Sequence, residues 1–214
     1  MLIQGQVGPS STQSSSPGTN PAVRQGQLGD VIVTELHGRY YEQAYRGNLF
    51  TLSVSTAAAI TAYTGAAGGT PMLAVYNPAN SGRNIVPIQV NYNNVVAASG
   101  AGTVSFALWF GPTAAITQTT LTYPVNNFTL NRVGSVTQCF TNIALTSSTA
   151  LTNIFPVGYY YWATAAGAFQ STPTIVDING SFIVPPGTMV ALGGTAALTS
   201  ATWVGSLTWE EVPL

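Results

Sequence analysis

Four segments in the chain place apolar residues at alternate positions. They are residues 50–54, 86–92, 104–110 and 203–209, and mainly polar or small residues stand between the apolar ones. A strand points successive side chains to opposite faces of its sheet, so this period of two is typical of strands with one buried face. The pattern predicts a chain built mainly of half-buried β-strands.

Shorter apolar runs and turn sequences lie between these segments. The runs are 72–76, 136–145, 154–162, 174–178, 182–184 and 189–192. With the four segments they give about nine or ten strands between residues 48 and 212, separated by Gly- and Pro-containing turns. Many short strands with such turns predict an all-β fold, an antiparallel β-sandwich or jelly roll.

Two stretches carry specific local predictions. Asn179-Gly180 stands between IVDI and SFIV, and Asn-Gly is the preferred sequence of a type I′ hairpin turn. Residues 56–70, TAAAITAYTGAAGGT, include several Thr and Gly, which are poor helix formers. We therefore predict a hairpin at the first stretch and a loop, rather than a helical turn, at the second.

The first 47 residues lack the alternating pattern. Residues 1–29 are rich in Ser, Gln, Gly and Pro and show no apolar periodicity. Such a segment is either a disordered tail or an arm that becomes ordered on a neighbouring molecule. We predict two parts, an extended N-terminal arm and linker at 1–47 and a β-sandwich domain at 48–214.

The linker at 30–47 holds five of the chain's eleven charged residues, counting five Lys or Arg and six Asp or Glu. Glu35–Arg39 and Glu42–Arg46 are each spaced four apart with Glu first, which is the favourable order on a helix. A glycine interrupts the first pair. The spacing predicts either a short helix at 39–46 or an extended linker whose ion pairs form between subunits.

Composition narrows the possible functions. Only 5% of the residues are charged, against about 25% in a typical domain. All five basic residues are arginines and they are dispersed, so they form no basic stripe for nucleic acid. Without lysine, a Walker-type phosphate loop and Schiff-base chemistry are excluded. A net charge of −1 favours association, so we expect the chain to be a subunit of an assembly. We expect neither nucleic acid nor a membrane as its partner.

Few residues are candidates for catalysis or metal binding. His37 and Cys139 are the only histidine and the only cysteine, and no carboxylate cluster accompanies either. Cys139 has no basic neighbour in the sequence and is predicted to be a small buried apolar residue. Glu210 and Glu211 are adjacent on a strand, point to opposite faces, and are expected to protect a sheet edge. We therefore expect no enzyme activity, cofactor or metal.

An aromatic cluster, Tyr159-Tyr160-Tyr161-Trp162, follows two apolar residues at alternate positions. Strict alternation makes one face the core, and Tyr160 and Trp162 then point outward. Outward Tyr and Trp are typical of subunit interfaces, and stacking on a glycan is the alternative. The residues predicted to face the core are Phe155, Val157, Tyr159 and Tyr161.

The C-terminal third carries a resemblance. FIVPPGTMVALGG at 182–194 and GSLTWEEVP at 205–213 resemble the last strands of jelly-roll virion proteins. The polar arm, the absence of Lys and the richness in Ala, Thr and Gly are similar to head and tail structural proteins of tailed bacteriophages. Similar turn-and-strand sequences occur in trimeric tumour-necrosis-factor-like and C1q-like domains.

This resemblance implies a non-enzymatic virion structural protein. The expected role is a decoration (cement) protein that binds the phage head as an oligomer, a trimer above all, with the major capsid protein as partner. Its expected location is the capsid surface, after synthesis in the host cytoplasm. The alternatives are a head- or tail-associated receptor-binding domain that takes a glycan, and a small capsid protein. The predicted partner-contact residues are Glu35, Arg39, Tyr40, Tyr41, Glu42, Tyr45, Arg46, Tyr160 and Trp162.

Overall fold

The structure, a computed structural model, describes residues 5–6, 23–24, 38–96, 102–132, 134–146, 148–162, 173–196 and 198–214. The chain divides into two compact units, Met1–Tyr41 and Glu42–Leu214. In the first unit, β1 (Gly5–Gln6) pairs in parallel with β2 (Val23–Arg24). The other predictions for residues 1–37, including those for Glu35 and His37, lie outside the described residues.

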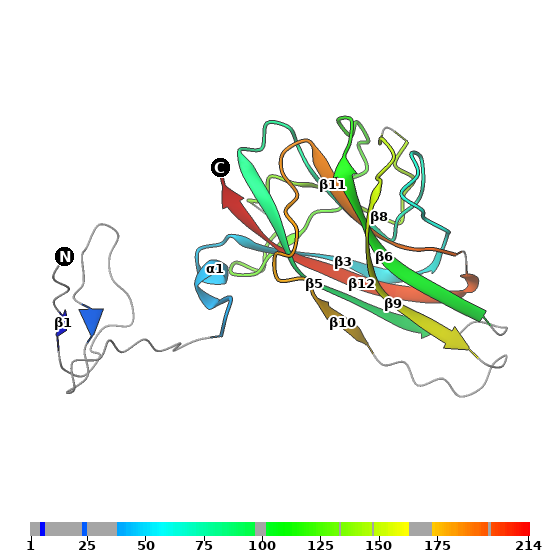
Figure 1. The fold of residues 1–214 in the computed structure, drawn as a ribbon, viewed down its shortest axis with the longest axis horizontal. Coiled ribbons are helices and arrows are strands. Elements are labelled where there is room, and N and C mark those ends of the chain that lie inside the picture. The colour runs from blue at the N-terminus through cyan, green and yellow to red at the C-terminus, as the bar shows by residue number, and fades with distance from the viewer. Residues whose placement is uncertain are drawn as a thin grey trace. The chain divides into compact units, whose positions relative to one another are not determined.

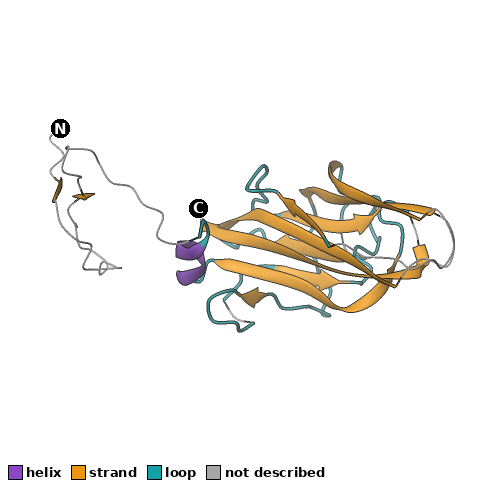
Figure 2. Cartoon of the chain, turned by 90° about the horizontal axis from the view of Figure 1, so that it is seen from below, coloured by secondary structure: helices purple, strands orange, loops and turns teal. Residues whose placement is uncertain are grey.

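One short helix and ten strands follow in the described residues (Figures 1 and 2). The helix lies within the span predicted for it and is followed by the alternating segments as strands. The elements are α1 (Tyr41–Tyr45), β3 (Leu49–Ile60), β4 (Leu73–Asn77), β5 (Arg83–Val96), β6 (Gly102–Pro112), β7 (Val125–Asn126), β8 (Gln138–Thr141), β9 (Asn153–Trp162), β10 (Thr174–Asp177), β11 (Thr188–Gly194) and β12 (Leu198–Pro213).

The strands form two five-stranded sheets, in the orders β10-β5-β12-β3-β7 and β8-β4-β11-β6-β9. Four antiparallel pairs are nested in the chain: β3 with β12, β4 with β11, β5 with β10 and β6 with β9. Successive pairs go to alternate sheets. A folded-over run of eight strands wound in this way is a jelly roll, so the predicted fold class is confirmed.

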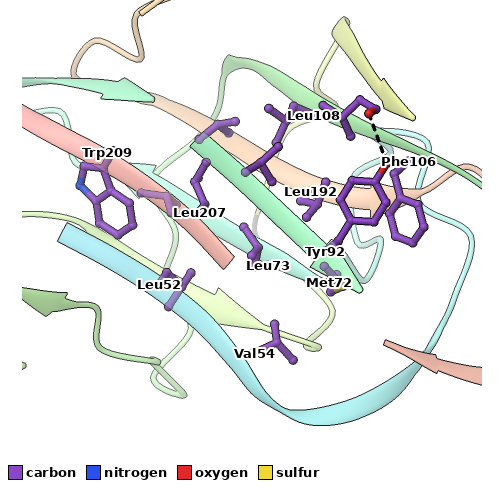
Figure 3. Packing of buried hydrophobic residues seen from close by; sticks show 14 of the residues in the cluster. Leu52, Val54, Met72, Leu73, Tyr92, Phe106, Leu108, Leu192, Leu207 and Trp209 are labelled. Carbon is purple, nitrogen blue, oxygen red and sulfur yellow. Dashed lines mark hydrogen bonds between the residues drawn. The ribbon is translucent and has the colours of Figure 1, made fainter. Parts of the chain in front are cut away.

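The core between the two sheets is made by the alternating residues of the sequence pattern. Leu52, Val54, Tyr92, Phe106 and Trp209 are among its buried members (Figure 3). Leu52, Val54, Tyr92 and Trp209 each stand between polar, more exposed neighbours, so burial of one face supplies the driving force for sheet packing.

A second apolar cluster lies on the other face of the second sheet. Ala74 and Tyr76 of β4 belong to it, whereas Leu73 and Val75 belong to the core between the sheets. Loop residues such as Tyr63 and Leu151 cover this face. This second layer explains why β4 is a continuous apolar run: both of its faces are buried.

The structure corrects the loop predicted at 56–70. Strand β3 continues through residues 56–60 before the chain leaves the sheet. Ala58 and Ala59 pair with β12 after an irregularity in register. Sheet pairing with a long neighbouring strand therefore outweighs the weak local preference of an Ala- and Thr-rich sequence.

The Asn179-Gly180 turn forms, but not as a hairpin. Both residues have positive φ, 50° and 73°, and the Ser181 amide donates to the Ile178 carbonyl at 3.0 Å, as a type I′ turn requires. The chain on both sides of the turn pairs with β5 instead of with itself, through β10 and then through a bridge from Val184. The hairpin prediction was wrong because β5 offers one long edge to both segments.

Candidate partner-binding site

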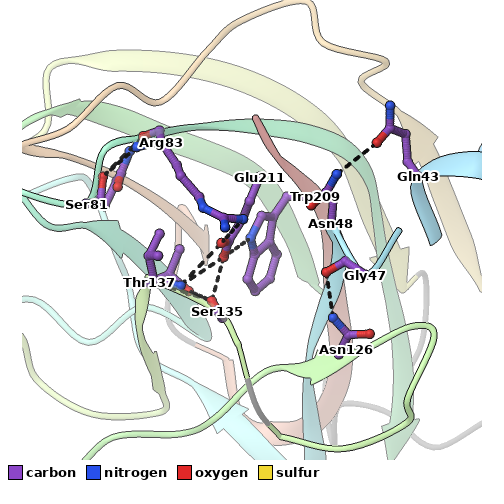
Figure 4. A network of polar contacts seen from close by, with 12 residues as sticks. Gln43, Gly47, Asn48, Ser81, Arg83, Asn126, Ser135, Thr137, Trp209 and Glu211 are labelled. Carbon is purple, nitrogen blue, oxygen red and sulfur yellow. Dashed lines mark hydrogen bonds and ion pairs between the residues drawn. The ribbon is translucent and has the colours of Figure 1, made fainter. Parts of the chain in front are cut away.

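Helix α1 leads directly into the start of the sandwich (Figure 1). The Asn48 side chain donates to the Gln43 side chain at 3.2 Å (Figure 4), and the Asn48 carbonyl accepts from the Glu211 amide at 2.9 Å. From the β7 side, the Asn126 amide group donates to the Gly47 carbonyl at 2.7 Å. These bonds fix the C-terminal end of the helix against β3, β7 and β12.

The loop after β7 is equally well held. The Asn126 side-chain oxygen accepts from the amides of Phe128 and Thr129, at 3.0 and 3.2 Å. The Asn126 carbonyl accepts from the amide of Leu130 at 2.8 Å. Leu130 has φ of 56°, in the left-handed region that costs a residue with a branched side chain about 1–2 kcal/mol. The loop thus keeps a strained backbone in a defined shape.

This fixed geometry displays large apolar side chains to solvent. Tyr45 of α1 and Phe128 of the loop contact each other edge to face, with ring centroids 5.3 Å apart. Their exposed fractions are 54% and 53%, and that of Leu130 is 75%. Arg46 and Arg132, which follow in the same two segments, are also exposed. We call these five residues the α1–loop surface.

Beneath this end of the sandwich lies a buried carboxylate, Glu211. Its oxygens accept from the Ser135 hydroxyl at 2.6 Å and the Val136 amide at 3.3 Å, and the Trp209 indole nitrogen lies at 3.5 Å. Arg83 completes the group with an ion pair at 3.6 Å. Glu211 is fully buried, whereas one third of the Arg83 side chain is exposed.

The edge-protecting role predicted for Glu210 and Glu211 is wrong. Their strand, β12, is the central strand of its sheet, with β5 on one side and β3 on the other. The two carboxyls do point to opposite faces, since Glu211 is buried in the network and Glu210 is half-buried on the other side. Burial raises the pKa of Glu210 above its ordinary value.

The predicted partner-contact residues fall into separate places. Arg39 is exposed, and its guanidinium carbon lies 5.4 Å from the centre of the Tyr40 ring. Tyr41 begins α1 and is 47% exposed. Of the predicted residues, the structure places Tyr45 and Arg46 on the α1–loop surface. The side chain of Glu42 and all of Glu35 lie outside the described residues, so both predicted Glu–Arg pairs stay predictions.

Tyr160 does not point outward as predicted. It packs on the core beside Trp203, with ring centroids 4.7 Å apart, and its hydroxyl contacts that of Thr174 at 3.0 Å. Tyr159 and Tyr161 are instead 73% and 65% exposed.

The reason is an irregularity in the β9–β6 register, where Phe106 pairs with Gly158 and Ala107 with Pro156. Val157 is the extra residue of this bulge, and a bulge reverses the alternation of every side chain after it. The predicted core face therefore holds for Phe155 and Val157 and fails for Tyr159 and Tyr161. The side chain of Trp162 lies outside the described residues.

The described part of the chain also contains the thiol and residues of the types that ligate metals. Cys139 is buried as predicted, and burial raises the pKa of its thiol to about 12. Among the described residues, no group of His, Cys, Asp and Glu is arranged to hold a metal ion. No helix within those residues is long and apolar enough to cross a membrane.

Sequence reasoning missed Phe128 and Leu130, and it gave Glu211 the wrong role. The burial of Glu211 could have been predicted from the pattern, because Glu211 stands two positions after the core residue Trp209 and shares its face. Phe128 and Leu130 lie in NNFTLN, where apolar residues stand among turn-forming asparagines. Apolar residues in a turn sequence are the signal that marks an exposed contact.

Comparison with known proteins gives little further guidance. No family model and no curated protein matches the chain. A solved structure of Israeli acute paralysis virus, a full particle heated to 63 degrees, matches with 10% identity over 100% of this chain and 83% of the matched chain. Its TM-score of 0.26 is too low for the match to carry an argument about fold or function.

Proposed function

We propose that the chain is a structural protein of a virus particle, and specifically a decoration protein that binds and stabilises the shell as an oligomer. In this role the jelly roll is a rigid body, and the N-terminal arm and the α1–loop surface make contacts with neighbouring subunits. The resemblance of residues 182–194 and 205–213 to virion jelly rolls supports the class of role. The net charge of −1 favours association and so supports a role as a subunit of an assembly.

The observation that carries the proposal is the α1–loop surface. Hydrogen bonds to the Asn126 side-chain oxygen fix a strained loop whose large apolar side chains, Phe128 and Leu130, are mostly exposed. Backbone strain that is held in place by surrounding bonds is characteristic of functional segments. Rigid aromatic and apolar anchors bind a partner at low entropic cost, and the flanking arginines select a partner with acidic groups at its rim.

Stabilisation of the shell then follows from mass action. A protein that binds the assembled shell and not its separated subunits raises the free energy needed to take the shell apart. The apolar anchors supply affinity, while Arg46 and Arg132 influence orientation and rate of association.

The test is co-sedimentation with undecorated shells of the virus that encodes the chain. A Phe128→Ser/Leu130→Asn variant should lose binding by at least about tenfold, because two exposed anchors are removed. Ile183→Ser is the matched control, since Ile183 is 54% exposed outside this surface. Equal binding by the double variant and the wild-type protein would refute the role of the surface, and no binding by either would refute the decoration role.

A second candidate function, glycan binding, is favoured by one observation. Tyr159 and Tyr161 are exposed on one face of β9, and Ser105 and Thr103 stand opposite them on β6. Aromatic rings beside hydroxyl groups suit a sugar. A glycan array probed with the wild-type protein and with Tyr159→Ser/Tyr161→Ser separates glycan binding from shell decoration. Glycan binding requires that the wild-type protein gives a signal and that the variant loses it. Shell decoration requires no such signal.

A further inference from the structure

Strand β3 has an open edge next to β7. On one side β3 pairs with β12 through residues 49–54 and again through residues 58–60. On the other side β7 pairs only with Phe50 and Thr51, because β7 is two residues long. Within the described residues, no strand pairs with Leu52–Ile60 on that side. Long unpaired edges bind other strands readily unless charge, proline or a covering loop protects them.

The direction of the main-chain groups follows from two hydrogen bonds. The Leu49 carbonyl accepts from the Asn127 amide at 2.9 Å on the β7 side, and the Asn48 carbonyl accepts from the Glu211 amide at 2.9 Å on the β12 side. In an antiparallel strand, successive residues point their N–H and C=O groups to opposite sides. The main-chain groups of Ser53 and Ser55 therefore point to the open edge.

A groove runs along this edge. Its first part, of about 180 Å³, has Thr51, Ser53 and Ser55 of β3 on one wall and Tyr123 and Arg132 on the other. Its second part, of about 220 Å³, continues along β3 as far as Thr61. Asn142 lines both parts, so the two are neighbours along β3. Small side chains on the β3 wall allow another backbone to approach closely.

We propose that this groove binds the segment 30–36 of a second copy of the chain as an added strand, which continues the sheet where β7 ends. This deepens the proposed function and rests on it, since it gives the arm its docking site in the oligomer. Segment 30–36, DVIVTEL, carries four consecutive β-branched residues, which favour strands.

Charge favours this occupant. Asp30 and Glu35 stand at either end of the β-branched run, and Arg132 is the one charged residue among the described residues that line the groove. One acidic end meets Arg132 while the backbone pairs with Ser53 and Ser55. In this mode of recognition main-chain bonds give affinity and side chains give register.

Crosslinking between two kinds of full-length chain tests the proposal. One kind carries Val33→Cys and the other, marked by a larger tag, carries Ser55→Cys; a short bis-maleimide joins them. Native Cys139 is buried and does not compete. We expect a crosslinked heterodimer from the mixture. Thr152→Cys, exposed at the start of β9 on the opposite edge of the other sheet, replaces Ser55→Cys as the control and should give none.

Two further variants examine the groove itself. Ser53→Pro removes the N–H that points to the open edge without touching the β12 pairing, and should lower the crosslink yield about fivefold, the effect of one lost hydrogen bond. Ser53→Ala keeps that N–H and should leave the yield unchanged. Arg132→Glu should lower the yield, and Asp30→Arg/Glu35→Arg on the arm copy should restore it. Circular dichroism and unfolding confirm that each variant is folded.

The outcomes separate the two proposals. Equal crosslinking at Thr152→Cys, no effect of Ser53→Pro in a folded variant, or crosslinking only when both cysteines share one chain would overturn the groove proposal. Crosslinking is measured on free protein, so it succeeds or fails independently of shell binding. A specific crosslink without shell binding would leave the groove assigned and refute the decoration function.

Discussion

The buried carboxylate of Glu211 permits a quantitative test of how this end of the sandwich is held. Glu211→Gln keeps the shape of the side chain, so it creates no cavity. It removes the negative charge that the Ser135 hydroxyl, the Val136 amide and Arg83 all face. It also replaces one carboxylate oxygen of Glu211 by an NH2 group. This new donor then faces the N–H groups of Val136 and Arg83 that lay against the oxygen.

The magnitude follows from these contacts. Hydrogen bonds to an ionised group are about twice as strong as neutral ones, so weakening two of them costs about 1–2 kcal/mol. The Arg83 pair adds about 1 kcal/mol or less, because one third of that side chain is exposed and solvent screens it. The total is about 1–3 kcal/mol. For a domain of this size that lowers the melting temperature by about 2–12 °C.

The assay is urea unfolding followed by tryptophan fluorescence, since Trp209 lies against the carboxylate. A double-mutant cycle with Arg83→Gln isolates the ion pair and should give a coupling of about 1 kcal/mol. A Glu211→Gln variant within about 0.5 kcal/mol of the wild type would refute the reasoning. It would mean that the desolvation cost of the buried charge cancels its bonds.

Three other predictions concern single positions. Gly158→Ala should lower the free energy of unfolding, measured with a denaturant, by about 1–3 kcal/mol, because a Cβ at this position meets the Tyr92 hydroxyl. Gly38→Ala is the control and should leave the free energy of unfolding unchanged, because a Cβ there has open space around it. Leu130→Asn should raise the melting temperature slightly while shell binding falls, because Asn tolerates the left-handed conformation better than Leu; a lower melting temperature would contradict the assigned strain. Burial raises the pKa of Cys139 and of Tyr92 to about 12 each, so both resist ionisation in the folded chain. These two groups should therefore make stability fall between about pH 9 and 12, because only the unfolded chain ionises there; a flat unfolding midpoint up to pH 12 would contradict this.

Most of the strands could be predicted from the sequence, because a strand with one buried face carries apolar residues at alternate positions. Residues 50–54, 86–92 and 104–110 all became strands as their alternation predicted. The errors arose where tertiary pairing decides. The bulge at Val157 reversed the faces after it, and the partner of the turn at Asn179 depended on a distant strand.

The candidate site was less predictable than the fold. Tyr45 and Arg46 were chosen for charge spacing and aromatic character, and both lie on the α1–loop surface. Phe128 and Leu130 were not chosen, because their exposure depends on the Asn126 bonds that shape the loop. A short polar loop has no periodicity from which exposure can be read.

The nested pairing of strands has a consequence for synthesis. The central strand of the first sheet, β12, comes last in the chain, and its neighbours β3 and β5 come from the first half. Until residue 213 has left the ribosome, that sheet lacks its middle and β3 lacks its long partner. Most contacts join residues far apart in sequence, so folding of the sandwich is expected to be slow and to wait for β12. Until then the assembly surfaces of the sandwich are unformed, and premature association at an early stage of synthesis would be avoided.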